Sequence, residues 1–369
     1  MSGGIEFYIH NLLRSLAEID QLNSYYIFTN NDNHSAFKFK ADNFQWIRSN
    51  IYARPQVKRV FWEQLFLPFA AIRYRLDVLH SPSYTWPLLS PVPGVVTICD
   101  MLYKHYPETI QQPKRTFWQV SVPWSAKRCR KVITISHNSK RDIVKHLGVP
   151  ADKVIVTPLA LDSRILDFVT LINADEKTRV CNKYSIKRPF ILNVGGLGKH
   201  KNAAALIRAF SELKKHSVVQ ETSLVITGND YGSKQELEAL ALSLGILDQV
   251  CFPGYVEHTD LPALYSAALI YASTSRFEGF GLTLLEAMAF GVPVISSNRS
   301  SLPEVAGYAA DIIDPDDIAG LASVLKKLLT DPSHRQKLRQ RSLERVKDFS
   351  WETTALLTLE AYKAAKKDV

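Results

Sequence analysis

The sequence predicts an α/β protein built from two doubly wound domains, and three observations support this. Short apolar runs alternate with helical patterns along the chain, as is typical of β-α units on parallel sheets. The length of 369 residues suits two domains rather than one. Hydrophobic residues make up 46% of the chain, which supplies a core for both domains.

Apolar runs bounded by turn residues predict the strands. They lie at residues 25–28, 78–80, 95–99, 131–135 and 153–156 in the first domain, and at 190–194, 223–227, 250–252, 269–272 and 293–296 in the second. Helical periodicity marks residues 5–19, 318–329 and 351–365, and the polar segment 162–188 indicates a linker. We therefore expect domains at residues 1–170 and 171–350, followed by a C-terminal helix over residues 351–369.

The net charge of +9 belongs almost entirely to the first domain. Residues 1–170 carry 21 Lys and Arg against 13 Asp and Glu, whereas residues 171–369 carry 24 against 23. The excess is either ordinary solvated surface or a region that attracts an anionic membrane or a phosphate-bearing acceptor. No motif of interleaved aromatic and basic residues is present, so nucleic acid is not an expected partner.

Cysteine spacing and hydropathy indicate the cellular compartment in which the protein is expected. Cys99, Cys129, Cys181 and Cys251 are widely spaced, without the close pairs that hold zinc or perform redox chemistry. Free thiols fit a reducing compartment. No apolar run approaches the roughly 20 residues that span a bilayer, and no signal-peptide pattern opens the chain. These features predict a cytoplasmic protein, either soluble or at the inner face of the membrane.

The most informative segment is residues 278–286, where two glutamates flank a turn rich in glycine. An apolar, strand-like run precedes it and a helical run follows it, so the glycines lie where a strand turns into a helix. Gly279 and Gly281 let the backbone approach a ligand closely. The unpaired N–H groups at the start of the helix favour an anion such as a diphosphate.

The two glutamates suggest separate roles in a sugar-nucleotide site. Glu286 lies in the first turns of the predicted helix, where its carboxylate can accept two hydrogen bonds from a vicinal diol such as that of ribose. Glu278 lies on the loop, closer to a reacting sugar. The alternative is that both acids only favour the helix N-terminus electrostatically. The glycines and the strand–turn–helix context favour the binding site.

With these motifs the sequence resembles the retaining glycosyltransferases of family four, whose GT-B fold has two facing Rossmann-like domains and a last helix that crosses back to the first. The similarity covers almost the whole chain and includes residues 194–202, 252–256, 291–295 and 301–305. It implies transfer of a hexose, with mannose and a GDP-sugar favoured over a UDP-sugar, to a hydroxyl of a growing surface polysaccharide or lipid-linked glycan. Beyond this donor the resemblance implies no cofactor and no metal.

The resemblance also assigns donor-binding residues in the second domain. Lys201 occupies the family's position for a lysine on the donor pyrophosphate, whereas Gly196 stands where many relatives have an arginine. Lys199 is a substitute point charge, or part of an ordinary solvated loop. The nucleobase pocket corresponds to Tyr255 and Val256. The backbone amides of the turn complete the diphosphate site, and they belong to Phe280, Gly281, Leu282 and Thr283.

The start of the chain departs from the family pattern. Gly3 and Gly4 match the loop whose amides lie near the donor diphosphate, but the strand that normally leads into this loop is missing. We interpret this as a late start of the chain. The alternative is that a neighbouring strand lies exposed at a central position of the sheet, which costs stability.

A second departure affects the sugar site of the first domain. Cys99 stands where relatives commonly have a histidine beside the donor sugar, and a thiol is a weaker hydrogen-bond partner than an imidazole. Cys99 is otherwise a small buried residue at a strand end. Candidate replacements for the imidazole are His80, His105 and His137. Asp100 remains available to orient acceptor or donor, so the expected catalytic residues are Glu278, Lys201 and Asp100.

Two further segments and two further functions stay open. Residues 61–69, flanked by Lys and Arg, are either a membrane-facing amphipathic helix or, as we favour, part of the core. Residues 314–317 resemble an acidic metal motif, but we interpret them as a turn and N-cap. Instead of a transferase, the chain could be a catalytically weak sugar-nucleotide-binding partner in a glycan-assembly complex, or a GT-B sugar-nucleotide epimerase.

Overall fold

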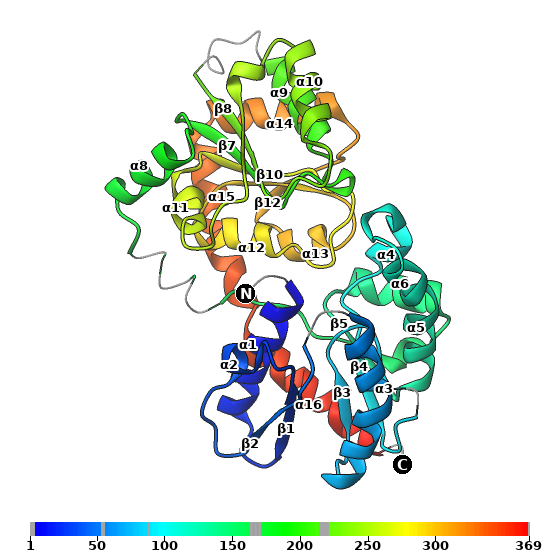
Figure 1. Cartoon of the computed structure of the whole chain (residues 1–369). Helices are drawn as coiled ribbons and strands as arrows, with labels where there is room; N and C mark the ends of the chain where they lie inside the picture. The colour runs from blue at the N-terminus through cyan, green and yellow to red at the C-terminus, as the bar shows by residue number, and fades with distance from the viewer. Residues whose placement is uncertain are drawn as a thin grey trace. The chain divides into compact units, whose positions relative to one another are not determined.

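The computed structural model describes residues 4–52, 56–87, 89–162, 165, 168, 171–213 and 221–367, and the chain divides into two compact units (Figure 1). One unit combines residues 1–159 with residues 350–369, and the other spans residues 160–349. The predicted α/β class with parallel sheets is confirmed, and so is the return of the C-terminal helix to the first unit. The division after residue 159 precedes the boundary expected near residue 170.

The first unit contains two separate parallel sheets. The smaller sheet pairs β1 (Tyr25–Thr29) with β2 (Phe44–Arg48). The larger has the order β3-β4-β5-β6, formed by Leu79–Ser81, Gly94–Thr97, Lys131–Thr134 and Val154–Val156. The helices of the first unit include α1 (Gly4–Ile19), α2 (His34–Phe37), α3 (Gln56–Arg73), α4 (Leu102–His105), α5 (Lys114–Arg128), α6 (His137–Leu147) and α16 (Trp351–Lys367).

The last helix, α16, is part of the core of the first unit. Ala361 and Ala365 pack against Val95 and Ile133 of the larger sheet, and such small residues let a helix lie close to a sheet. At its start the ring of Trp351 lies edge-on to Phe7 of α1, with centroids 5.7 Å apart. The helix therefore covers strands that precede it by more than half the chain.

Hydrogen bonds reinforce this packing through His80 at β3. One ring nitrogen, Nδ1, lies 2.8 Å from the hydroxyl of Tyr362 on α16, and the other, Nε2, lies 2.8 Å from Oγ1 of Thr97 on β4. Burial lowers the pKa of His80 to about 3, so the imidazole is neutral at physiological pH. Its partners make His80 a structural residue of the first unit.

A cavity of about 750 Å³ lies between the two sheets of the first unit. Residues of β1, β3, α1, α3 and α16 line it. In the part of the chain that the structure describes, β1 pairs only with β2 and β3 only with β4, so each strand at the cavity has an edge without a strand partner.

The second unit is built on one six-stranded parallel sheet of order β12-β11-β10-β7-β8-β9. In chain order the strands are β7 (Phe190–Val194), β8 (Ser223–Thr227), β9 (Val250–Gly254), β10 (Ile270–Ser273), β11 (Val294–Ser297) and β12 (Ala310–Ile313). The helices include α8 (Ala174–Lys183), α9 (Ala203–Glu212), α10 (Lys234–Ser243), α11 (Leu261–Ala267), α12 (Leu282–Ala289), α13 (Leu302–Ala306), α14 (Ile318–Thr330) and α15 (Pro332–Arg345).

The strand order places a topological switch point at one edge of this sheet. From β7 the chain builds β8 and β9 to one side, and then β10, β11 and β12 to the other. The loops that follow β7 and β10 therefore leave the sheet in opposite directions, and ligands of doubly wound sheets bind at such a switch point. The apolar faces of α9 and α14 close the core on the sheet with side chains such as Phe210 and Leu325.

Among the described residues, no helix combines the length and the hydropathy needed to cross a membrane.

We expect a strand-forming segment joined ahead of α1 to stabilise the first unit. Such a segment can pair with the open edges of β1 and β3 and bury apolar side chains, each worth about 1.5–3 kcal/mol. Calorimetry should then show a Tm at least about 5 °C higher than that of the unextended chain. A segment of equal length with proline at alternate positions is the control, because proline cannot donate ladder hydrogen bonds. Equal Tm values for the two extensions would show that the cavity does not accept a strand.

Candidate active site

The candidate site centres on an ion pair at the switch point of the second unit. Lys201 ends a single 3-10 turn after β7, and Glu278 lies in the loop after β10. The ammonium Nζ of Lys201 lies 2.7 Å from Oε1 of Glu278. Only 14% and 16% of the two side chains are exposed, so solvent screens the pair weakly. Two of the three predicted catalytic residues are thus in direct contact.

Glycines make room for this pair. Gly195 and Gly196 have φ angles of 139° and 88°, which residues with a Cβ rarely adopt. A Cβ on Gly195 would lie 2.9 Å from Nζ of Lys201. A Cβ on Gly228, in the loop after β8, would lie 2.1 Å from the amide nitrogen of Gly196. Sequence reasoning missed Gly228, although its place directly after a predicted strand was a usable signal.

The backbone around Lys201 is tied to the neighbouring loops. The hydroxyl of Thr274, after β10, donates to the carbonyl oxygens of Lys201 and Asn202 at 3.3 and 3.0 Å. The side-chain amide of Asn202 donates to the carbonyl oxygen of Pro315 at 2.9 Å. These bonds fix the loop after β7 to the loops after β10 and β12, so the lysine is held before any ligand binds.

Serine hydroxyls position Glu278. Ser275 donates to Oε1 of the Glu278 carboxylate at 2.7 Å, so this oxygen accepts bonds from both Ser275 and Lys201. The hydroxyls of Ser300 and Ser301 donate to the backbone carbonyl of Glu278 at 2.7 and 2.8 Å. Sequence reasoning did not assign these serines. Serine is common in loops, so Ser275 does not stand out although it is only three residues from Glu278, and the distance of Ser300 and Ser301 along the chain hides their contacts.

The turn before α12 is built as predicted, with glycine at the helix start. Gly281 is the N-cap residue with φ of 109°, and a Cβ there would lie 2.9 Å from the side chain of Leu302 on α13. Ser301 also donates to the carbonyl oxygen of Phe280 at 2.8 Å. The first turn of α12 contains Leu282 and Thr283, whose N–H groups lie at a helix start where intrahelical acceptors are lacking.

Glu286 lies on α12 in a largely apolar setting. The hydroxyl of Tyr265 donates to its Oε2 at 2.8 Å, and the ring of Tyr265 stacks on Phe290 with centroids 5.7 Å apart. Burial raises the pKa of Glu286 to about 7. The carboxyl is therefore poised between its two protonation states near neutral pH, and a ligand that donates hydrogen bonds to it would favour the charged form.

The predicted nucleobase residues follow β9 at the same edge of the sheet. The carbonyl oxygen of Gly254 accepts from the hydroxyl of Thr227 at 2.7 Å and from the amide of Gly228 at 2.8 Å. These bonds join the loop after β9 to the loop after β8. Tyr255 is 56% exposed and Val256 is buried. The predicted donor residues of the second unit thus all lie on loops at the carboxyl edge of one sheet, or on α12, which begins there.

The remaining predicted site residues belong to the first unit. Gly3 lies outside the described residues, and Gly4 begins α1. Asp100 follows β4, and its Oδ1 accepts from the hydroxyl of Tyr84 at 3.1 Å and from the amide of Leu102 at 3.0 Å. The carboxylate therefore supports the start of α4.

The interpretation of Cys99 as a small buried residue is confirmed. Burial raises the pKa of its thiol well above the ordinary range, which keeps the sulfur neutral. Of the alternative imidazoles, His80 is held by Tyr362 and Thr97, as described above.

The acidic segment at residues 314–317 is the predicted turn and N-cap. The side chain of Asp317 accepts from the amide of Gly320 at 2.9 Å and caps α14. Asp314 pairs with Arg299 at 3.0 Å, and Asp316 pairs with Arg276 at 2.6 Å. The carboxylates are engaged with arginines and backbone, which confirms the interpretation as a turn and N-cap.

Comparison with known proteins gives matches over both units. The family "Glycosyl transferases group 1" matches residues 175–345, and "Glycosyltransferase Family 4" matches residues 2–164. The chain is 31% identical over 291 residues to the O-antigen chain mannosyltransferase B of Escherichia coli, which covers 79% of this chain and 75% of the relative.

Solved glycosyltransferase structures share the fold. A glycosyltransferase from Rickettsia africae has a TM-score of 0.73 at 17% identity, over 100% of this chain and 96% of that one. HepE from Anabaena, in complex with UDP and glucose, has a TM-score of 0.71 at 16% identity, over 98% and 96%. At these identities the likeness concerns the fold, and it confirms the predicted GT-B class.

We expect Glu286→Gln to stabilise the second unit in a pH-dependent way. The folded-state pKa of Glu286 is about 7, above its ordinary value of 4.5, so folding keeps a proton that the unfolded chain loses. This carboxyl therefore lowers stability progressively as pH rises from about 4.5 to 7, and the loss persists above that range. Glutamine keeps an acceptor for Tyr265 without the charge.

The Tm of Glu286→Gln should exceed that of the wild type at pH 8, with a smaller difference at pH 5, when both are measured by differential scanning fluorimetry. Glu238→Gln, which changes a half-exposed carboxylate on α10, is the matched control and should show no such trend. A Tm difference that is the same at both pH values would contradict the assignment of the shift to Glu286.

Proposed function

The chain belongs to glycosyltransferase family four, and from this membership we propose that it transfers mannose from GDP-mannose to a hydroxyl of a growing glycan, with retention of configuration. The family makes it a hexosyltransferase with a nucleotide-sugar donor and a glycan acceptor. The observation that carries the proposal is the Lys201–Glu278 pair at the switch point, beside the glycine-rich loop and the start of α12.

In this proposal the second unit binds the donor through a lysine side chain and backbone amides. Lys201 donates to the diphosphate, and a charge-assisted bond of this kind contributes about 1.5–3 kcal/mol. The amides at the start of α12 bind the same group, because helix N-termini favour anions. Glu286 accepts hydrogen bonds from the ribose diol, and the exposed ring of Tyr255 lies on the loop assigned to the base.

Retention follows from reaction on one face of the sugar. As the bond between the anomeric carbon and the diphosphate oxygen breaks, the acceptor oxygen attacks the same face of the oxocarbenium-like centre. The departing phosphate takes the acceptor proton. Lys201 and the amides stabilise the charge that grows on the leaving group, so the protein supplies electrostatic stabilisation and we propose no metal for this step. Glu278 orients Lys201 and lies nearest the reacting sugar.

The choice of donor rests on the relatives. The Escherichia coli relative is named a mannosyltransferase, and an O-antigen chain is a surface polysaccharide, which supports mannose and a glycan acceptor. The HepE structure contains UDP and glucose, so UDP-glucose is the second donor to test. The proposed site of action is the inner face of the membrane, where the four free cysteines fit a reducing compartment.

The surface of α3 supports a peripheral contact with the membrane. Residues 61–69 lie within α3, and the favoured interpretation of them as core holds for only part of the segment. Leu67 is buried, whereas Phe61, Phe66 and Phe69 are 63%, 54% and 71% exposed. Ile72 is 61% exposed on the same helix. Exposed aromatic and aliphatic side chains beside basic residues are typical of interfacial helices.

The donor assignment is tested by transfer assays with GDP-, UDP-, ADP- and dTDP-sugars and a mannose-containing acceptor. Lys201→Ala and Glu278→Ala should each lower kcat/KM with the preferred donor by more than about 100-fold, because each removes part of the charge arrangement at the leaving group. Lys234→Ala, at a half-exposed lysine on α10, is the control. Nuclear magnetic resonance of the product should show the anomeric configuration of the donor.

Near-wild-type turnover by both variants would refute the proposed site. Donor binding without any product would favour the sugar-nucleotide-binding partner, and a changed sugar without an acceptor would favour the epimerase.

Membrane contact is tested by co-sedimentation with vesicles that contain about one third anionic lipid. Replacing Phe61, Phe66 and Phe69 together by serine should weaken binding at least about tenfold, because three exposed aromatic side chains lose their insertion into the interface. Leu242→Ser, at a 65% exposed site on α10, should bind like the wild type. Unchanged sedimentation of the triple variant would exclude α3 as the contact.

A further inference from the structure

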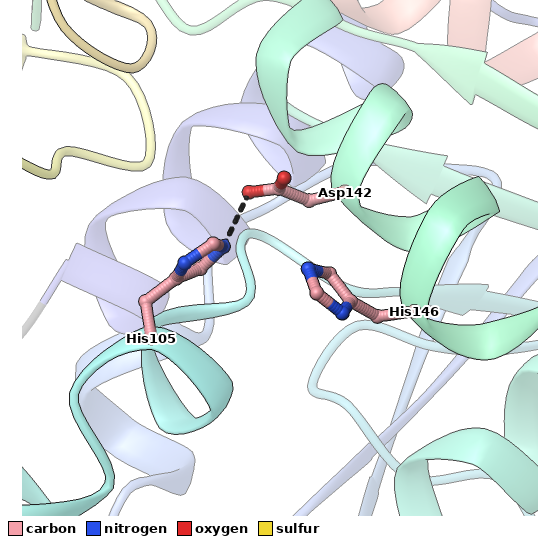
Figure 2. A group of neighbouring side chains, drawn as sticks. All are labelled: His105, Asp142 and His146. Atoms are coloured by element: carbon pink, nitrogen blue, oxygen red, sulfur yellow. Dashed lines mark hydrogen bonds and ion pairs between the residues drawn. The ribbon is translucent and has the colours of Figure 1, made fainter.

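Three side chains of the first unit that take no part in the proposed transfer meet at its surface. Figure 2 shows His105 from α4 turned toward Asp142 and His146 from α6. One donor atom from each residue lies within 4.8 Å of the donor atoms of the other two. We infer that these residues form a zinc site that ties α4 to α6.

The geometry is close to that of a bound metal. The Nε2 atom of His105 lies 2.9 Å from Oδ2 of Asp142, and the rings of His105 and His146 are perpendicular, with centroids 5.3 Å apart. Donors around tetrahedral Zn²⁺ lie roughly 3.3 Å from one another, given bonds of about 2.0–2.1 Å. Small side-chain rotations therefore suffice, and the two histidines are exposed enough to make them.

The helix spacing favours chelation. Asp142 and His146 are four residues apart on α6, so they project from the same face. The helix that carries them is well anchored: Ser136 accepts from the amide of Ser139 at its start, and Gly148 in the left-handed conformation ends it. Two ligands thus stand on a rigid element, and only the third, His105, comes from another segment.

The donor set selects the class of metal. Two imidazoles and one carboxylate suit Zn²⁺, whose three-ligand sites keep a fourth position for water. Ca²⁺ and Mg²⁺ prefer oxygen ligands alone. Elsewhere in the structure, His334 pairs with Asp311 at 2.8 Å. The third donor distinguishes the cluster from a simple histidine–aspartate pair of this kind.

A metal bound here would stabilise the segment that begins at Asp100. The helix α4 has four residues and follows Asp100 almost directly, and isolated helices this short are marginal. Zinc would fix its last residue, His105, to α6, while the Asp100 carboxylate holds its first amide. The metal would thereby stabilise the segment from Asp100 to His105 at both ends. This role is separate from sugar transfer and from the leaving group.

Isothermal titration calorimetry with ZnCl₂ tests the inference. The protein is the untagged, chelator-treated full chain in the absence of donor. We expect one Zn²⁺ per chain with a Kd on the order of 10 µM or lower. Asp142→Asn and His146→Gln should each weaken binding at least about tenfold. His137→Gln, which changes an exposed histidine at the start of the same helix, should bind zinc like the wild type.

Two further measurements separate a built site from scattered histidine binding. Bound Co²⁺ should give the visible absorption of a four-coordinate site in the wild type but not in Asp142→Asn. Zinc should slow amide hydrogen exchange across residues 101–106 in the wild type alone. The inference is overturned if no binding is detected at a free zinc concentration about tenfold above the expected Kd. It is also overturned if both cluster variants still bind zinc. An equal loss in His137→Gln would overturn it as well.

Discussion

The Lys201–Glu278 ion pair is the interaction on which the second unit depends. Two charges this buried are tolerable only when they are paired and further hydrogen-bonded. The local structure meets that demand: glycines clear space on one side, Ser275 shares the carboxylate, and Thr274 holds the backbone of the lysine. The sheet order places both loops at the switch point, so the topology brings the two charges together. In the proposed donor site, an anionic ligand would therefore meet a positive group that is already fixed.

The first unit depends on a different network, which lies in its core. The hydroxyl of Thr97 contacts His80 at 2.8 Å and the hydroxyl of Tyr8 at 3.2 Å, and His80 in turn contacts Tyr362. Four elements, α1, β3, β4 and α16, thus share one chain of hydrogen bonds. Burial keeps His80 neutral and raises the pKa of Tyr8, so the network carries no charge at physiological pH. Like the ion pair of the second unit, this network satisfies buried polar groups with hydrogen bonds, but it contains no charged residues.

Much of the fold could be predicted from local sequence patterns, and there are physical reasons why some strands and contacts were missed. The buried strands such as β7 and β8 are continuous apolar runs and were found within a residue or two. The strand β2 carries a glutamine and an arginine, and β12 carries an aspartate, so neither showed a clear apolar run. At the site, the glycines and glutamates stood out because their spacing is local. The partner of Glu286, Tyr265, and the role of His80 depend on contacts between distant segments, which no local pattern records.

The return of α16 to the first unit has a consequence for biosynthesis. The second unit is one continuous stretch of chain, so it can complete its fold once residue 349 has left the ribosome. The first unit is synthesised earlier, yet Val95 and Ile133 lack the helix that covers them until the final residues emerge. The order of folding is therefore the reverse of the order of translation. The nascent amino-terminal half therefore keeps part of its core uncovered until α16 has been synthesised.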